Sequence, residues 1–155
     1  DAIHDGNVSY TILTAAAASG DANYSGLNPD DVSVTNNDDA DTAGITVTPT
    51  SGLTTTEVPQ STDSFTVVLD SEPTADVVIG ISSNDTTEGT VAPISLTFTS
   101  GNWDTPQTVT VTSVDDPDAE PGGTVYQIET APATSTDTNY DGLDADDVSV
   151  TNTDT

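Results

Sequence analysis

The chain has 155 residues, 27 of them acidic, with no Lys or Arg and a formal net charge of −27 at pH 7. Binding to nucleic-acid phosphates or to anionic lipid headgroups is therefore excluded, because both depend on clustered Lys and Arg. The chain also lacks Cys, which excludes disulfides and thiolate metal sites. Its apolar residues are interrupted too often by Thr and Ser to form a membrane-spanning segment.

The composition favours an all-β protein. Val, Ile and Thr make up 53 of the 155 residues, and these β-branched side chains are stiff and pack well on a pleated sheet. No stretch has a convincing helical period, so we expect no helix of consequence.

The chain is internally repetitive, with an offset of 116 residues. Residues 6–38 align without gaps with residues 122–154, and the sequence Asp-Asp-Val-Ser-Val-Thr-Asn is identical in both. We predict that residues 1–41 are the C-terminal third of a preceding repeat plus a linker, and that residues 42–155 form one complete repeat. We expect the chain to be a segment of a longer tandem array.

Two copies of an acidic loop place side-chain oxygens at positions 1, 3 and 5, before a glycine at position 6. The residues at those positions are Asp21, Asn23 and Ser25 in the first copy and Asp137, Asn139 and Asp141 in the second. This is the first half of an EF-hand-type calcium loop. Neither copy has Glu at position 12, so the closing ligand would be one of the following aspartates, namely Asp30, Asp31, Asp146 and Asp147. The alternative is a turn in which Asp and Asn bind their own backbone.

A further acidic group lies between the two periods, at Asp38, Asp39 and Asp41. It follows the last strand expected in one period and precedes the first strand expected in the next. A cation bound there would stiffen the connection, whereas the alternative is a solvated polar linker.

Alternation of apolar residues with threonine predicts half-buried antiparallel strands in the complete repeat. The predicted segments are 45–48, 65–69, 77–81, 96–99, 108–112, 125–130 and 148–151. Turn signals containing Pro, Gly, Ser and Asn separate several of them. We therefore predict an immunoglobulin-like antiparallel β-sandwich of about seven strands, repeated in a tandem array.

The acidic residues are crowded into loops, and this crowding points to bound cations. Two carboxylates ~4 Å apart repel by ~4 kcal/mol at an effective dielectric constant of 20. Several such pairs would rival the ~5–15 kcal/mol that holds a domain together. Because no Lys or Arg is present to relieve the repulsion, we expect inorganic cations, above all Ca²⁺, to supply the counter-charge.

The complete repeat resembles the Calx-beta repeat family. The resemblance rests on Glu57 after a turn, Phe65–Leu69, Asn102–Trp103 and the acidic run that begins at Asp115. It implies a seven-stranded sandwich that binds calcium through acidic loops at one end, as in sodium/calcium exchangers, integrin-type proteins and large bacterial surface proteins. The implied ligands are Glu57, Asp115, Asp116, Asp118 and Glu120. The family has an Asp-Tyr pair in the middle of the repeat, and this chain lacks it. The segment at that place runs from Asn84 to Gly89.

These features predict a calcium-stabilised structural repeat of a secreted or cell-surface filament, stalk or adhesin. Its partners would be adjacent repeats of the same protein, joined head to tail as a filament or homopolymer. The alternative is a carbohydrate- or partner-binding adhesin module that uses Trp103 or the Tyr24 and Tyr140 loops. A third interpretation treats the acidity as an adaptation to high salt. We predict no enzyme, because catalysis by Ser or Thr usually needs a basic partner and His4 is the only one.

Overall fold

The computed structural model describes residues 2–38, 41–117 and 122–153. The chain divides into two compact units, one of Asp5–Ala40 and the other of Ala2–His4 with Asp41–Thr155. All regular structure in the described parts consists of β-strands, which confirms the all-β prediction. No helix among these residues is long and apolar enough to cross a membrane.

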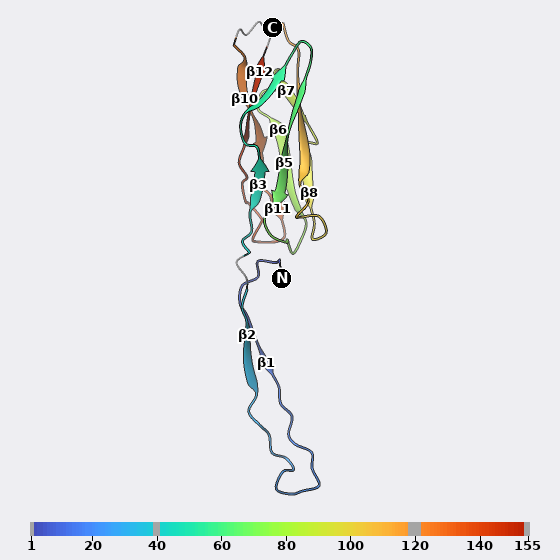
Figure 1. Cartoon of the computed structure of the whole chain (residues 1–155), viewed down its shortest axis with the longest axis vertical. Coiled ribbons are helices and arrows are strands. Elements are labelled where there is room, and N and C mark those ends of the chain that lie inside the picture. The colour runs from blue at the N-terminus through green and yellow to red at the C-terminus, as the bar shows by residue number, and fades with distance from the viewer. Residues whose placement is uncertain (1, 39–40, 118–121, 154–155) are drawn as a thin grey trace. The chain divides into compact units, whose positions relative to one another are not determined.

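The first unit is a two-stranded antiparallel hairpin (Figure 1). Strand β1 (Val8–Ile12) pairs with β2 (Val32–Asn36), so that Val8 lies opposite Asn36 and Ile12 lies opposite Val32. Apolar residues alternate with Ser and Thr along both strands, yet every strand residue except Val34 is exposed. The reason is that a single two-stranded ribbon has no second layer against which it could bury a face.

The second unit is a β-sandwich (Figure 1). One sheet has the order β3-β5-β9-β7, and the other has the order β11-β6-β10-β12-β4 with β8 also paired to β6. The first sheet contains β3 (Ile45–Thr48), β5 (Thr62–Leu69), β7 (Gly89–Ala92) and β9 (Gln107–Ser113). The second contains β4 (Leu53–Thr56), β6 (Val77–Ser83), β8 (Ser95–Phe98), β10 (Thr124–Thr130), β11 (Thr134–Ser135) and β12 (Val148–Thr153). The predicted immunoglobulin-like sandwich is confirmed.

The core lies between the two sheets and follows the period-2 pattern of the sequence. Strand β5 buries Phe65, Val67 and Leu69, and β6 in the other sheet buries Ile79 and Ile81. The residues between them on the same strands are half-buried or exposed. Alternating side chains on a pleated strand point to opposite faces, so each sheet contributes one apolar face to the core.

The chain changes sheets between β3 and β4. Gly52 in this turn has a φ of +86°, a conformation that glycine adopts at little cost. After the turn, β4 pairs in parallel with β12, with Leu53 opposite Val150. The sequence pattern does not predict β4, because the buried position of Thr55 carries a polar residue. Strands β7 and β11 are also missed, since four and two residues show too little alternation.

Candidate metal centre

Three buried polar side chains meet at one end of the sandwich, where the ends of β4 and β12 lie close to the start of β7. The residues Glu57, Glu88 and Asn152 are 2%, 3% and 1% exposed. The Asn152 side-chain nitrogen donates to Glu57 Oε1 at 2.8 Å and to Glu88 Oε2 at 3.2 Å. The Thr55 hydroxyl donates to Asn152 Oδ1 at 2.9 Å, which orients the amide nitrogen toward the two carboxylates. Two acidic groups that are distant in sequence therefore share one amide group.

This arrangement concentrates negative charge in a poorly solvated place. Burial of a carboxylate is costly unless another charge or several hydrogen bonds compensate it. The sequence contains no Lys or Arg that could provide a positive charge. Hydrogen bonds such as those from Asn152 compensate part of this cost, and a bound cation would supply positive charge to Glu57 and Glu88.

Tyr126 on β10 adds a further oxygen-bearing side chain near Glu88. It is 3% exposed, and its hydroxyl makes no hydrogen bond within the described residues. Burial raises the pKa of Tyr126, and the carboxylates of Glu88 and Asp85 raise it further, against an opposing effect of the Thr55 hydroxyl. The phenol is therefore neutral at physiological pH and presents its oxygen to the site. Only glycine fits next to it at position 89, because a Cβ there would lie 2.1 Å from the phenol oxygen.

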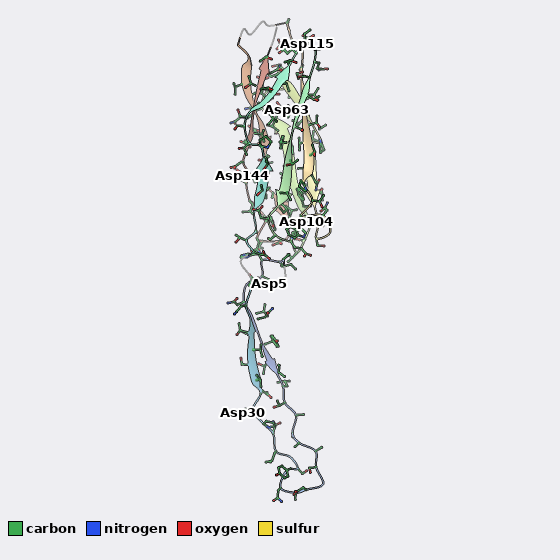
Figure 2. The ribbon with its side chains drawn as sticks, viewed as in Figure 1. Asp5, Asp30, Asp63, Asp104, Asp115 and Asp144 are labelled. Atoms are coloured by element: carbon green, nitrogen blue, oxygen red, sulfur yellow. The ribbon has the colours of Figure 1, made fainter. Side chains whose placement is uncertain are left out.

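Asp115 and Asp116 follow β9 at the same end of the sandwich. Backbone contacts bring this strand end to the buried acids: the Val114 N–H donates to the Glu88 carbonyl at 3.0 Å, and the Ser113 hydroxyl donates to the Thr56 carbonyl at 2.6 Å. Asp115 is exposed and Asp116 is half-buried. Figure 2 shows Asp115 at the end of the sandwich opposite Asp104.

The fold thus brings together some of the ligands that the Calx-beta resemblance implies. Glu57, Asp115 and Asp116 belong to segments that meet at this end, whereas Asp118 and Glu120 lie outside the described residues. Within the described ranges, no three Asp, Glu or His side chains gather closely enough to form a metal site. The calcium ligands predicted here remain a prediction.

The Asp137 loop uses its carboxylate to hold backbone. Asp137 Oδ2 accepts from the Thr74 N–H at 2.8 Å, and Oδ1 accepts from the Asn139 N–H at 2.9 Å. Burial acts to raise the pKa of Asp137, but these hydrogen bonds and the nearby His4 outweigh it, so the pKa lies below its ordinary value. Asp141 Oδ1 accepts from the Ser135 N–H at 3.2 Å. The contacts to Asn139 and Ser135 are those of the turn interpretation, in which acidic side chains cap the local backbone. The bond from Thr74 instead ties the loop to the segment before β6.

The first copy of the loop has the same local geometry. Asp21 Oδ1 accepts from the backbone and side-chain nitrogens of Asn23, both at 2.9 Å. The Ser25 N–H donates to the Asp21 carbonyl at 3.0 Å, as the Asp141 N–H does to the Asp137 carbonyl at 2.9 Å. The repeat therefore conserves the turn in both units.

Two of the aspartates predicted to close these loops contact the backbone of the preceding strand segments instead. Asp147 Oδ1 accepts from the Thr130 N–H at 2.9 Å, and Asp31 Oδ1 accepts from the Thr14 N–H at the same distance. Asp147 thus holds the last residue of β10, and Asp31 holds Thr14, two residues after β1 ends. The preceding residues of each pair, Asp30 and Asp146, are exposed.

The acidic residues between the periods fall in both units. Asp38 Oδ2 accepts from the Gly6 N–H at 3.0 Å within the hairpin unit. The Asp41 carbonyl contacts His4 Nδ1 at 2.5 Å within the sandwich unit. Asp39 lies outside the described residues.

Sequence reasoning missed Glu88, Asn152 and Tyr126 as members of this site. The sequence gives part of this signal. Glu88 precedes a glycine in an otherwise polar segment, and Asn152 is the last residue of the segment that is identical with residues 30–36. The sequence pattern does not predict that β12 pairs with β4, and this pairing brings Asn152 to Glu57.

Comparison with known proteins defines the fold. No family model and no curated protein matches the chain. The periplasmic chaperone SfaE superposes with a TM-score of 0.55 at 10% identity over 72% of this chain, which spans 58% of the SfaE chain. WR4, a C. elegans MSP family member, gives 0.43 at 13% identity, covering 72% of this chain and 97% of WR4. Domains 4 and 5 of the S-layer protein SbsC give 0.37 at 13% identity, covering 96% and 71%. The likeness to SfaE supports an immunoglobulin-like β-sandwich and nothing finer.

Proposed function

We propose that this chain is a calcium-stabilised structural repeat of a secreted or cell-surface filament, stalk or adhesin. The observation that carries the proposal is the pair of buried carboxylates, Glu57 and Glu88, on the single amide of Asn152. In a chain with no Lys or Arg, a divalent cation would relieve their repulsion.

The residues at this end of the sandwich have the chemistry that Ca²⁺ prefers. Ca²⁺ takes six to eight oxygen ligands, mostly from carboxylates, carbonyls and water. Glu57 and Glu88 would hold it, and Asp115 or Asp116 would have to move toward them from the end of β9 to complete the protein ligands, because no three acidic side chains gather closely enough among the described residues. The Calx-beta resemblance supports the same choice, because Glu57, Asp115 and Asp116 are the positions that it implies. The bound ion would supply positive charge and connect three segments that are separate in sequence.

For the Asp137 and Asp21 loops we propose a structural role in place of calcium binding. The argument is that both oxygens of Asp137 already accept backbone hydrogen bonds. A metal ion would have to share or displace those bonds, which also lower the pKa of this carboxyl group.

A rigid extracellular role is consistent with the calcium affinity expected. Extracellular calcium modules bind with Kd values of ~10⁻⁴ to 10⁻³ M, so they are filled outside the cell and empty in the cytoplasm. We propose an extracellular or cell-envelope location and no catalytic activity. The carbohydrate-binding alternative has less support, since the Trp103 ring is only partly exposed and packs against the core.

Calcium titration of the metal-free protein tests the proposal. At a Ca²⁺ concentration 100 times the Kd, binding stabilises the folded state by ~2.7 kcal/mol, which corresponds to a rise in Tm of roughly 10 °C for a domain of this size. Glu57→Gln should abolish most of the rise, while Glu129→Gln, the same change at an exposed position on β10, should preserve it. KCl at matched ionic strength distinguishes calcium binding from a general salt effect. An unchanged Tm up to ~100 mM Ca²⁺, which is 100 times the weakest Kd expected, refutes the proposal.

A further inference from the structure

The hairpin β1–β2 has the same construction as the closing hairpin of the sandwich, β10–β12. Val8 lies opposite Asn36 in the first, and Thr124 lies opposite Asn152 in the second. These pairs are related by the 116-residue offset of the sequence repeat. The same hairpin, in the same register, therefore occurs twice in one chain in two different environments.

In the sandwich, this hairpin is covered on one face and paired on both edges. Strand β10 pairs with β6 on its outer edge, and β12 pairs with β4 on the other. The inward side chains Ile128, Val148 and Val150 are all 0% exposed. The loop is also anchored, because the buried Tyr140 hydroxyl donates to the Ser71 carbonyl at 2.6 Å.

In the hairpin unit, the matching side chains are open. Ile12 and Val32 are each 50% exposed, Tyr10 is 51% exposed, and Tyr24, the counterpart of Tyr140, is 61% exposed. Among the described residues, β1 and β2 pair only with each other. An apolar strand face with two open edges is a template for strand addition to another sheet.

The sandwich itself shows which surface fits this hairpin. Residues 42–117 provide the core under the closing hairpin and the edges of β4 and β6 on either side of it. Each side chain that enters this slot has a counterpart of the same type in the first hairpin: Tyr10 for Tyr126, Ile12 for Ile128, Val32 for Val148, Val34 for Val150 and Asn36 for Asn152.

We propose that the hairpin β1–β2 inserts between β4 and β6 of a second molecule built like residues 42–117, where it takes the place of the closing hairpin. The two molecules are then joined head to tail, and Asn36 occupies the position from which Asn152 contacts Glu57 and Glu88. The partner is a copy of this sandwich whose slot is open. In the intact chain the covalently attached β10–β12 hairpin fills the slot at a high effective concentration, so the intact chain is a monomer.

A pair of matched substitutions in the full chain tests this docking. Ile128→Asp places a charge in the core position of the chain's own closing hairpin and opens the slot, leaving the first hairpin intact. Ile12→Asp makes the same change in the first hairpin. In the double variant, neither hairpin can insert into the slot. Size is measured by sedimentation velocity and folding by urea unfolding, in EDTA and in CaCl₂, over a wide range of protein concentration.

The expected result is specific to Ile128→Asp. This variant forms folded oligomers whose size grows with concentration, whereas the double variant forms none and is unfolded. Ile12→Asp alone is a monomer with the urea midpoint of the wild type. The proposal is overturned if Ile128→Asp stays monomeric, folded or not, or if it aggregates to the same extent with and without Ile12→Asp. Because the inference does not rest on calcium, a failure here leaves the calcium response of the wild type as a separate test.

Discussion

Substitution Glu88→Gln separates the cost of the buried acidic pair from the benefit of an ion bound to it. Glu57 Oε1 and Glu88 Oε2 lie 2.8 and 3.2 Å from one nitrogen, so these oxygens are within about 6 Å of each other. Two unit charges at that distance repel by about 3 kcal/mol at an effective dielectric constant of 20. Glutamine keeps the shape and an acceptor for Asn152 but removes one charge, at a cost of about 1 kcal/mol for the weaker hydrogen bond.

We therefore expect Glu88→Gln to increase the free energy of unfolding by about 2 kcal/mol in EDTA and to lose most of the stabilisation by calcium. The assay is urea unfolding at neutral pH, followed by the fluorescence of Trp103, which packs against the core. Glu129→Gln on the exposed side of β10 is the matched control and should change neither quantity. A lower unfolding free energy of Glu88→Gln in EDTA would refute the reasoning, because it would mean that the two carboxylates do not repel in the metal-free protein.

Three further tests probe the packing and the loop, and two of them have a matched control substitution. Ile128→Ala should lower the unfolding free energy by about 2–5 kcal/mol, whereas Ile12→Ala, at the equivalent exposed position, should change it by less than about 0.5 kcal/mol; urea unfolding measures both. Tyr140→Phe should cost about 1–3 kcal/mol through lost buried hydrogen bonds, while Tyr24→Phe should be silent in the same assay. The pKa of Asp137 is lowered in the folded state, so its contribution is complete above the unfolded pKa of ~3.9 and is lost as the pH falls through the folded pKa. Asp137→Asn should therefore flatten the acid limb of stability measured from pH 6 to pH 2, and an unchanged slope would contradict this assignment.

The strands with strict alternation could be predicted from the sequence. Strand β5 reads as apolar at Phe65, Val67 and Leu69, and these are the residues that the structure buries. The repeat also predicted a relation between the first and last segments, and their hairpins share one register. Local pattern was sufficient here because each strand buries one face against the other sheet.

The candidate site was harder to predict, because it depends on contacts between distant segments. The buried position of Thr55 has a hydroxyl that bonds Asn152, so a polar residue is stable where the pattern requires an apolar one. Glu88 has an unremarkable sequence context, and its burial follows from the pairing of β7 with β9. The EF-hand-like spacing predicted ligands at Asp137 and Asn139, but such spacing also produces a capped turn, and the hydrogen bonds are those of a turn.

The parallel pairing of β4 with β12 has a mechanical consequence. Strand β4, early in the sandwich, and β12, its last strand, run in the same direction side by side at Leu53–Thr56 and Val150–Thr153. Tension applied through the two ends of the repeat pulls these strands in opposite directions, so it loads the hydrogen bonds between them in shear. Bonds loaded in this way must break together and not one after another. In the filament or stalk proposed above, this pairing would make the sandwich resist stretching between its two ends.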